Sequence, residues 1–80
     1  MKLYQFKAKF LKRLILYRPK NAKEQQVREL LIARLENLRS MTMPYFLSTC
    51  HAILRDSEIS NELKKIVEEM VENIPEGEEE

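Results

Sequence analysis

The chain has 80 residues, of which 44% are hydrophobic and 34% charged, with a formal net charge of +1. This composition fits one small domain and argues against a wholly disordered chain. Its single cysteine, Cys50, excludes an intrachain disulfide, and its single glycine, Gly77, excludes a glycine-rich phosphate loop. No apolar run is long enough to span a membrane, and a lone thiol favours a reducing compartment, so we expect a cytoplasmic protein.

The first element can be interpreted as a helix or as a strand. Residues 2–20 contain seven lysines and arginines and no acidic residue. A helix over about 3–18 has one apolar side, made of Leu3, Phe6, Phe10, Leu14 and Tyr17. A strand over about 4–10 alternates aromatic or small residues with polar ones. Because a lone strand must pair with another copy to satisfy its backbone, we favour the helix.

The strand interpretation, followed by two helices, is similar in pattern to ribbon-helix-helix repressors. In that family the paired strands of a dimer lie in the DNA major groove. The resemblance covers about half of the chain and rests on the alternation. It implies that Gln5, Lys7 and Lys9 contact bases or phosphates.

A helix over about 22–39 is predicted next, and Asn21 and Glu24 form a capping box at its start. Its apolar face consists of Val27, Leu30, Leu31, Leu35 and Leu38. Arg34 falls within this stripe, so its head reaches solvent or meets an acidic residue of the last helix or of a second subunit. Ile32 points away from the stripe, and we expect it to be exposed as a second contact surface.

Two more helices are predicted over about 44–55 and 58–74, the first beginning at Pro44 and the second capped by Asp56 or Ser57. The apolar face of the first consists of Met43, Phe46, Leu47, Cys50, Ile53 and Leu54. The stripe of the second consists of Ile59, Leu63, Ile66, Val67, Met70, Val71 and Ile74.

Acidic residues dominate the end of the chain, where residues 56–80 carry ten acidic and two basic residues. On the last predicted helix, Lys64 and Lys65 lie four positions from glutamates, which predicts an exposed face with salt bridges along one helix. The predicted divisions are a basic amphipathic N-terminal segment (1–20), a helical core (21–74) and a disordered acidic tail (75–80). The predicted fold is all-α, a small helical bundle of three to four helices.

The sequence contains no catalytic constellation, so we expect no enzyme and no cofactor. Cys50 and His51 are adjacent, and neighbouring positions on a helix point about 100° apart, so they cannot form a dyad. We interpret Cys50 as a small core residue.

We therefore expect a non-catalytic protein–protein interaction module, a small helical adaptor or regulator that self-associates. A dimer is favoured because a chain this short often needs a partner subunit, and the candidate interface residues are Ile32 and Arg34. The alternative is a nucleic-acid-binding regulator that uses the basic segment. Its candidate contact residues are Gln5, Lys7, Lys9, Lys12, Arg13 and Arg18. Peripheral contact with an anionic membrane surface ranks below both.

Overall fold

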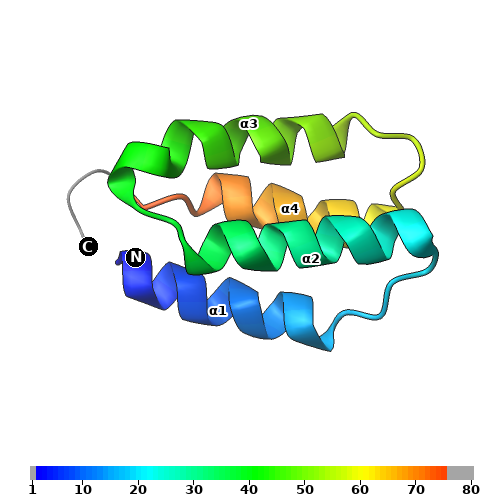
Figure 1. The fold of residues 1–80 in the computed structure, drawn as a ribbon, viewed down its shortest axis with the longest axis horizontal. Helices are drawn as coiled ribbons and strands as arrows, with labels where there is room; N and C mark the ends of the chain where they lie inside the picture. Colours follow the sequence, from blue (N-terminus) through cyan, green and yellow to red (C-terminus); the bar gives the residue numbers. More distant parts are fainter. Residues whose placement is uncertain (1, 76–80) are drawn as a thin grey trace.

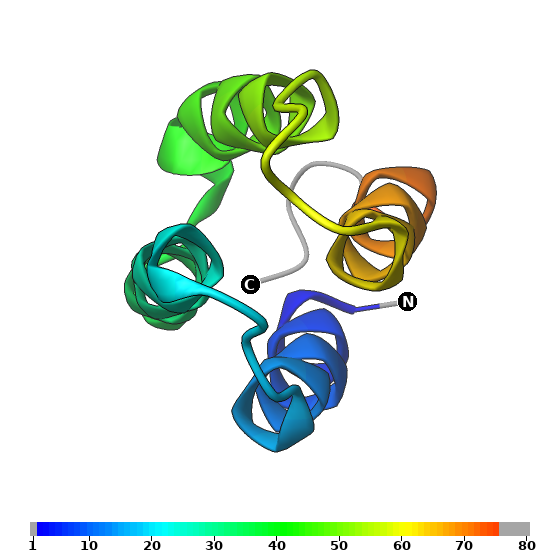
Figure 2. The same ribbon diagram turned by 90° about the vertical axis from the view of Figure 1, so that its right-hand side faces the viewer.

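The computed structural model describes residues 2–75, which form a bundle of four antiparallel α-helices (Figure 1). The helices are α1 (Leu3–Leu16), α2 (Ala22–Glu36), α3 (Met43–Leu54) and α4 (Asn61–Glu72), and a 3-10 turn, η1 (Ser40–Thr42), precedes α3. Seen end-on, the helices occupy four corners (Figure 2), with contacts between α1 and α2, α2 and α3, α3 and α4, and α4 and α1. The all-α prediction is confirmed.

The N-terminal segment is a helix, and its interpretation as a strand is wrong. Phe6, Phe10 and Leu14 are fully buried on one side of α1, and a helix satisfies its own backbone without a partner strand. Helix α1 ends at Leu16, two residues before the predicted end. The residue before a proline is disfavoured in the helical conformation, so Pro19 stops the helix early.

The start of α2 is capped as predicted, because the Asn21 side chain accepts a hydrogen bond from the Glu24 backbone N–H at 2.8 Å. Its buried face consists of Glu24, Val27, Leu31 and Leu35. Leu30, which the pattern placed on this face, is 42% exposed. The helix ends at Glu36, three residues before the predicted end, and Leu38 is buried just beyond it.

Helix α4 begins three residues later than predicted, with Ser60 as its cap in place of Asp56 or Ser57. The Ser60 hydroxyl accepts from the Leu63 backbone N–H at 3.4 Å. The Asp56 carboxylate accepts from the Glu58 backbone N–H at 2.9 Å, which stabilises the preceding loop. Helix α3 begins at Met43, one residue before the predicted start.

Aromatic rings from α1 and α3 meet in the centre of the bundle. The Phe6 ring lies 4.9 Å from that of Phe10 and 6.2 Å from that of Phe46, the second pair edge to face. Cys50 is fully buried, and burial raises the pKa of its thiol to about 12. His51, its neighbour, is exposed. Cys50 is therefore a core residue, as predicted.

No helix within residues 2–75 combines the length and the apolar character that a membrane crossing requires. Pro75, the first residue of the predicted acidic tail, is buried. The rest of that predicted tail, residues 76–80, lies outside the described residues.

Candidate interaction surface

The basic first segment and the acidic last helix form ion pairs with each other. Arg13 of α1 pairs with Glu69 of α4, and Lys20 pairs with Glu62 near the start of α4. No ion pair joins Lys64 to a glutamate of its own helix within the part of the chain that the structure describes. Lys65 likewise has no such pair among the described residues, and two glutamates of α4 pair instead with Arg13 of α1 and with Lys20 of the loop that follows α1. The side chains of the first pair are about one third exposed and those of the second are more than half exposed, so solvent screens both attractions.

Glu24 joins three segments of the chain at one end of the bundle. Its Oε1 accepts hydrogen bonds from the Tyr17 hydroxyl at 2.6 Å and from the Lys20 backbone N–H at 3.0 Å. Its Oε2 accepts from the Ser60 backbone N–H at 2.7 Å. In a capping box the Glu24 side chain would accept from the Asn21 backbone N–H. Here it accepts instead from the backbone N–H groups of Lys20 and of Ser60, the cap of α4.

The same carboxylate is fully buried. Burial alone would raise the pKa of Glu24, but the hydrogen bonds from Tyr17, Ser60 and Lys20 favour its charged form and lower the pKa to about 2. Burial, together with the hydrogen bond to Glu24, raises the pKa of Tyr17. The capping role of Glu24 follows from its position in the sequence, whereas its contact with the start of α4 depends on how distant segments pack.

Internal contacts engage several of the candidate nucleic-acid residues of α1. The Lys7 ammonium donates to the Leu38 carbonyl at 3.3 Å, and Arg13 pairs with Glu69 as described above. The Gln5 side chain accepts from the Lys2 backbone N–H at 3.0 Å and so helps to cap α1. Lys9, Lys12 and Arg18 stay exposed, although the Lys9 ammonium lies 5.3 Å from the centre of the Phe10 ring.

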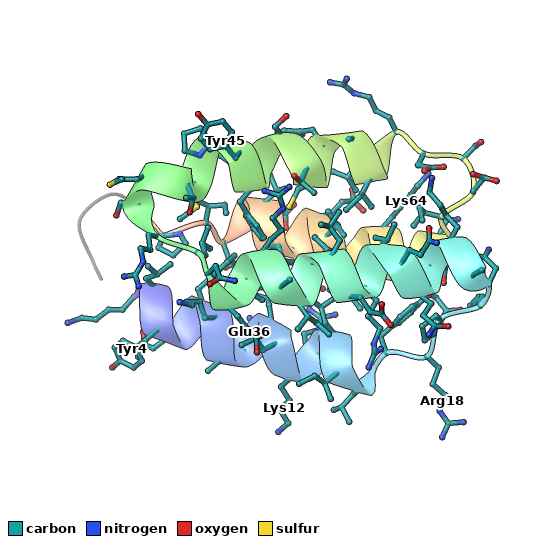
Figure 3. The ribbon with its side chains drawn as sticks, viewed as in Figure 1. Tyr4, Lys12, Arg18, Glu36, Tyr45 and Lys64 are labelled. Atoms are coloured by element: carbon teal, nitrogen blue, oxygen red, sulfur yellow. The ribbon has the colours of Figure 1, made fainter. Side chains whose placement is uncertain are left out.

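Large apolar side chains are exposed on α1 although the core is closed. Tyr4 is 65% exposed, Ile15 58% and Leu16 70%. Figure 3 shows Tyr4 and Lys12 projecting from the side of α1 that faces away from the other helices. We call this surface the outer face of α1, and it consists of Tyr4, Gln5, Ala8, Lys9, Lys12, Ile15 and Leu16.

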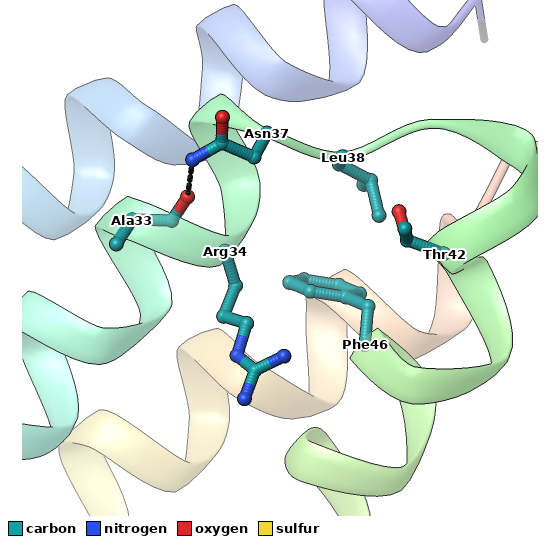
Figure 4. A pocket seen from close by; sticks show the side chains of 6 residues that line it. All are labelled: Ala33, Arg34, Asn37, Leu38, Thr42 and Phe46. Atoms are coloured by element: carbon teal, nitrogen blue, oxygen red, sulfur yellow. Dashed lines mark hydrogen bonds between the residues drawn. The ribbon is translucent and has the colours of Figure 1, made fainter.

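The candidate interface residues of α2 differ in their surroundings. Ile32 is partly buried and packs against the core, so the expectation that it is exposed is wrong. Arg34 is exposed, and its side chain lies beside Phe46 in a shallow hollow at the C-terminal end of α2 (Figure 4). Within residues 2–75 it forms no ion pair with α4. Its exposure agrees with a head that reaches solvent, and its contact with a second subunit stays a prediction.

We compared the chain with protein-family models, with curated proteins and with solved structures, and none of these comparisons finds a significant match.

Proposed function

We propose that this protein is a non-catalytic protein–protein interaction module, a small helical adaptor or regulator that self-associates, with a dimer as its working form. The observation that carries the proposal is the outer face of α1, where Tyr4, Ile15 and Leu16 remain exposed around a closed core. An apolar surface rimmed by charged residues is typical of a binding site.

Burial at an interface would give this surface a favourable energy. Removing a large apolar side chain from water contributes roughly 1.5–3 kcal/mol, so Ile15 and Leu16 together form a substantial anchor. The size of the chain supports the same view, because a domain of 80 residues buries a smaller share of its surface than a larger one does. We place the module in the cytoplasm, where Cys50 stays a thiol.

The mass of the full-length protein in solution tests the proposal. Sedimentation equilibrium or light scattering at tens of micromolar should give about twice the chain mass of 9.6 kDa, falling toward the monomer mass on dilution. A strict monomer across this concentration range would contradict self-association.

A second candidate function is nucleic-acid binding, and the exposed cations of the N-terminal segment favour it. Lys9, Lys12 and Arg18 are exposed, and residues 2–20 contain no carboxylate to repel phosphates. If these three residues each neutralise one phosphate, the logarithm of the affinity for duplex DNA should fall with the logarithm of the salt concentration with a slope of about −2.7.

Gel-shift titrations at rising salt test this second function. Each change of Lys9, Lys12 or Arg18 to glutamine should weaken binding and reduce the slope by about 0.9. Lys64→Gln on α4 is the matched control, since that helix carries the acidic residues. Absence of any shift at low salt would exclude the second function.

A further inference from the structure

Helix α1 carries a second apolar stripe in addition to the one that faces the core. Tyr4, Ala8, Leu11 and Ile15 follow each other at intervals of four, three and four residues, the spacing of a coiled-coil seam. Tyr4, Ala8 and Ile15 are exposed, and Leu11 is partly buried. We call these four residues the α1 seam.

The α1 seam occupies the part of the outer face of α1 that borders α2, because Lys7, three and four positions from Tyr4 and Leu11, donates to the Leu38 carbonyl just beyond α2. Arg28 of α2 donates to the carbonyls of Leu14 at 2.7 Å and Ile15 at 3.0 Å, so it marks the side of α2 that is turned toward α1. Ile32 and Glu36 follow Arg28 at four-residue intervals and therefore lie along the same side of α2. Ile32 thus continues the apolar surface of the seam onto α2.

The two rims of this surface, where α1 adjoins α2, carry opposite charge in their exposed residues. On the α1 side the exposed rim residue is Lys12, within a segment that has no acid. On the α2 side the rim consists of Glu29 and Glu36, both exposed. Figure 3 shows Glu36 between the ribbons of α2 and α1, and Lys12 at the outer edge of α1.

These charges distinguish between two ways of pairing copies of the chain. A two-fold axis perpendicular to the helices would lay α1 on α1 and bring two acid-free basic helices together, which like-charge repulsion disfavours. A two-fold axis parallel to the helices lays α1 on α2 of the second copy. The basic rim of each copy then meets the acidic rim of the other.

The heights of the residues along the bundle match in the second arrangement. The Lys7–Leu38 and Ile15–Arg28 hydrogen bonds place the two residues of each pair at similar positions along the bundle axis. A two-fold axis parallel to the helices leaves these positions unchanged in the second copy. Lys12 then lies within about one helical turn of Glu29 of the partner subunit, twice in each dimer.

We infer that the α1 seam binds a second copy of this chain, with α1 of each copy packed antiparallel on α2 of the other around a two-fold axis parallel to the helices. This inference rests on the proposed function and names the surface and the symmetry of the self-association. The interface consists of the seam and Ile32 in its centre, with Lys12 and the two α2 glutamates at its rims.

Substitution in the centre of the seam is the first test. Ala8→Arg places a bulky charged side chain at an exposed helical position without entering the core, and it should convert the dimer to a monomer in sedimentation equilibrium. The matched control is Ser48→Arg, at an exposed position of α3, the helix diagonal to α1, which should remain dimeric. Circular dichroism confirms that both variants are folded.

Charge reversal across the rims tests the symmetry. Lys12→Glu and Glu29→Lys should each weaken the homodimer about tenfold or more, since each places like charges opposite one another twice. An equimolar mixture of the two variants should recover the wild-type affinity, because both contacts of the mixed dimer again join opposite charges. A two-fold axis perpendicular to the helices would instead lay α1 on α1, so Lys12→Glu should then pair best with the wild-type chain.

The outcomes separate this inference from the proposed function. A monomeric wild-type protein would overturn both. A wild-type dimer that Ala8→Arg leaves intact would overturn only the α1 seam as its interface. Recovery in a mixture of Lys12→Glu with wild type, without recovery in the mixture of Lys12→Glu with Glu29→Lys, would overturn the symmetry.

Discussion

Replacing Glu24 by glutamine measures how much one buried carboxylate contributes to the stability of the bundle. Glutamine has nearly the same shape, but the nitrogen that replaces one carboxylate oxygen donates hydrogen bonds and cannot accept one. At least one of the three donors that Glu24 satisfies, from Tyr17, Lys20 and Ser60, would therefore lose its partner. A fall in the pKa of Glu24 from 4.5 to about 2 corresponds to about 3 kcal/mol of stabilisation by the charged form.

The direction of the pH dependence follows from this pKa. Because the pKa of Glu24 is lower in the folded protein than in the unfolded chain, its contribution is complete above the unfolded value of 4.5 and is lost as the pH falls toward about 2. A domain of this size has a free energy of unfolding of roughly 4–12 kcal/mol. The loss of about 3 kcal/mol is therefore a large share of the total.

Urea denaturation followed by circular dichroism, at pH values from 7 downward, is the assay. Glu24→Gln should lower the free energy of unfolding by about 3 kcal/mol at pH 7, and its difference from wild type should shrink as the pH falls below 5. Glu68→Gln, at an exposed position of α4 outside the proposed interface, is the control and should change little. The reasoning would be refuted if Glu24→Gln lowered the free energy of unfolding at pH 7 no more than the control does. It would also be refuted if the difference between Glu24→Gln and wild type did not vary with pH.

Three other measurements test the packing of the bundle. Phe10→Ala should lower the free energy of unfolding by about 3–5 kcal/mol, because it leaves a cavity beside the Phe6 ring; a loss below about 1 kcal/mol would contradict full burial. Arg28→Ala should cost about 1–3 kcal/mol, since it removes two charge-assisted hydrogen bonds to the last turn of α1; thermal unfolding checks this, and an unchanged midpoint would count against it. Cys50 should react slowly with a thiol reagent in the native protein and rapidly in urea, because burial raises its thiol pKa to about 12; labelling of the native protein at the rate of a free cysteine would show an accessible thiol.

Local patterns in the sequence were sufficient to predict most of the fold. The existence of α2, α3 and α4 follows from apolar residues at helical spacing, and the Asn21 cap follows from its position before such a run. The start of α4 was placed too early because Asp56 and Ser60 both suit a cap. With Ser60 as the cap, Ile59 remains in the preceding loop and its side chain enters the core. The choice of cap therefore depends on tertiary packing.

The contacts between distant segments were beyond the reach of these patterns. The charge gradient along the chain is visible in the sequence, but the pairing of Arg13 with Glu69 depends on α1 and α4 being neighbours in the bundle. Burial of Ile32 depends in the same way on α1 packing beside α2, which extends the apolar surface around the helix. The candidate interaction surface could thus be assigned to the basic segment, but not to individual side chains.

The way in which α1 ends has a consequence for the order of folding. The chain has no glycine among residues 2–75 that could terminate a helix locally, and the last carbonyls of α1 are satisfied by Arg28 from the next helix. A peptide with the sequence of α1 alone would fray at this end, since without Arg28 the Ile15 carbonyl would have only water as a partner and the Leu14 carbonyl would keep only the Tyr17 backbone N–H at 3.2 Å. The helical hairpin of α1 and α2 is the smallest fragment that contains these hydrogen bonds. The residues that contact each other within it are close in the sequence. We expect this hairpin to nucleate the bundle, with α3 and α4 adding to it.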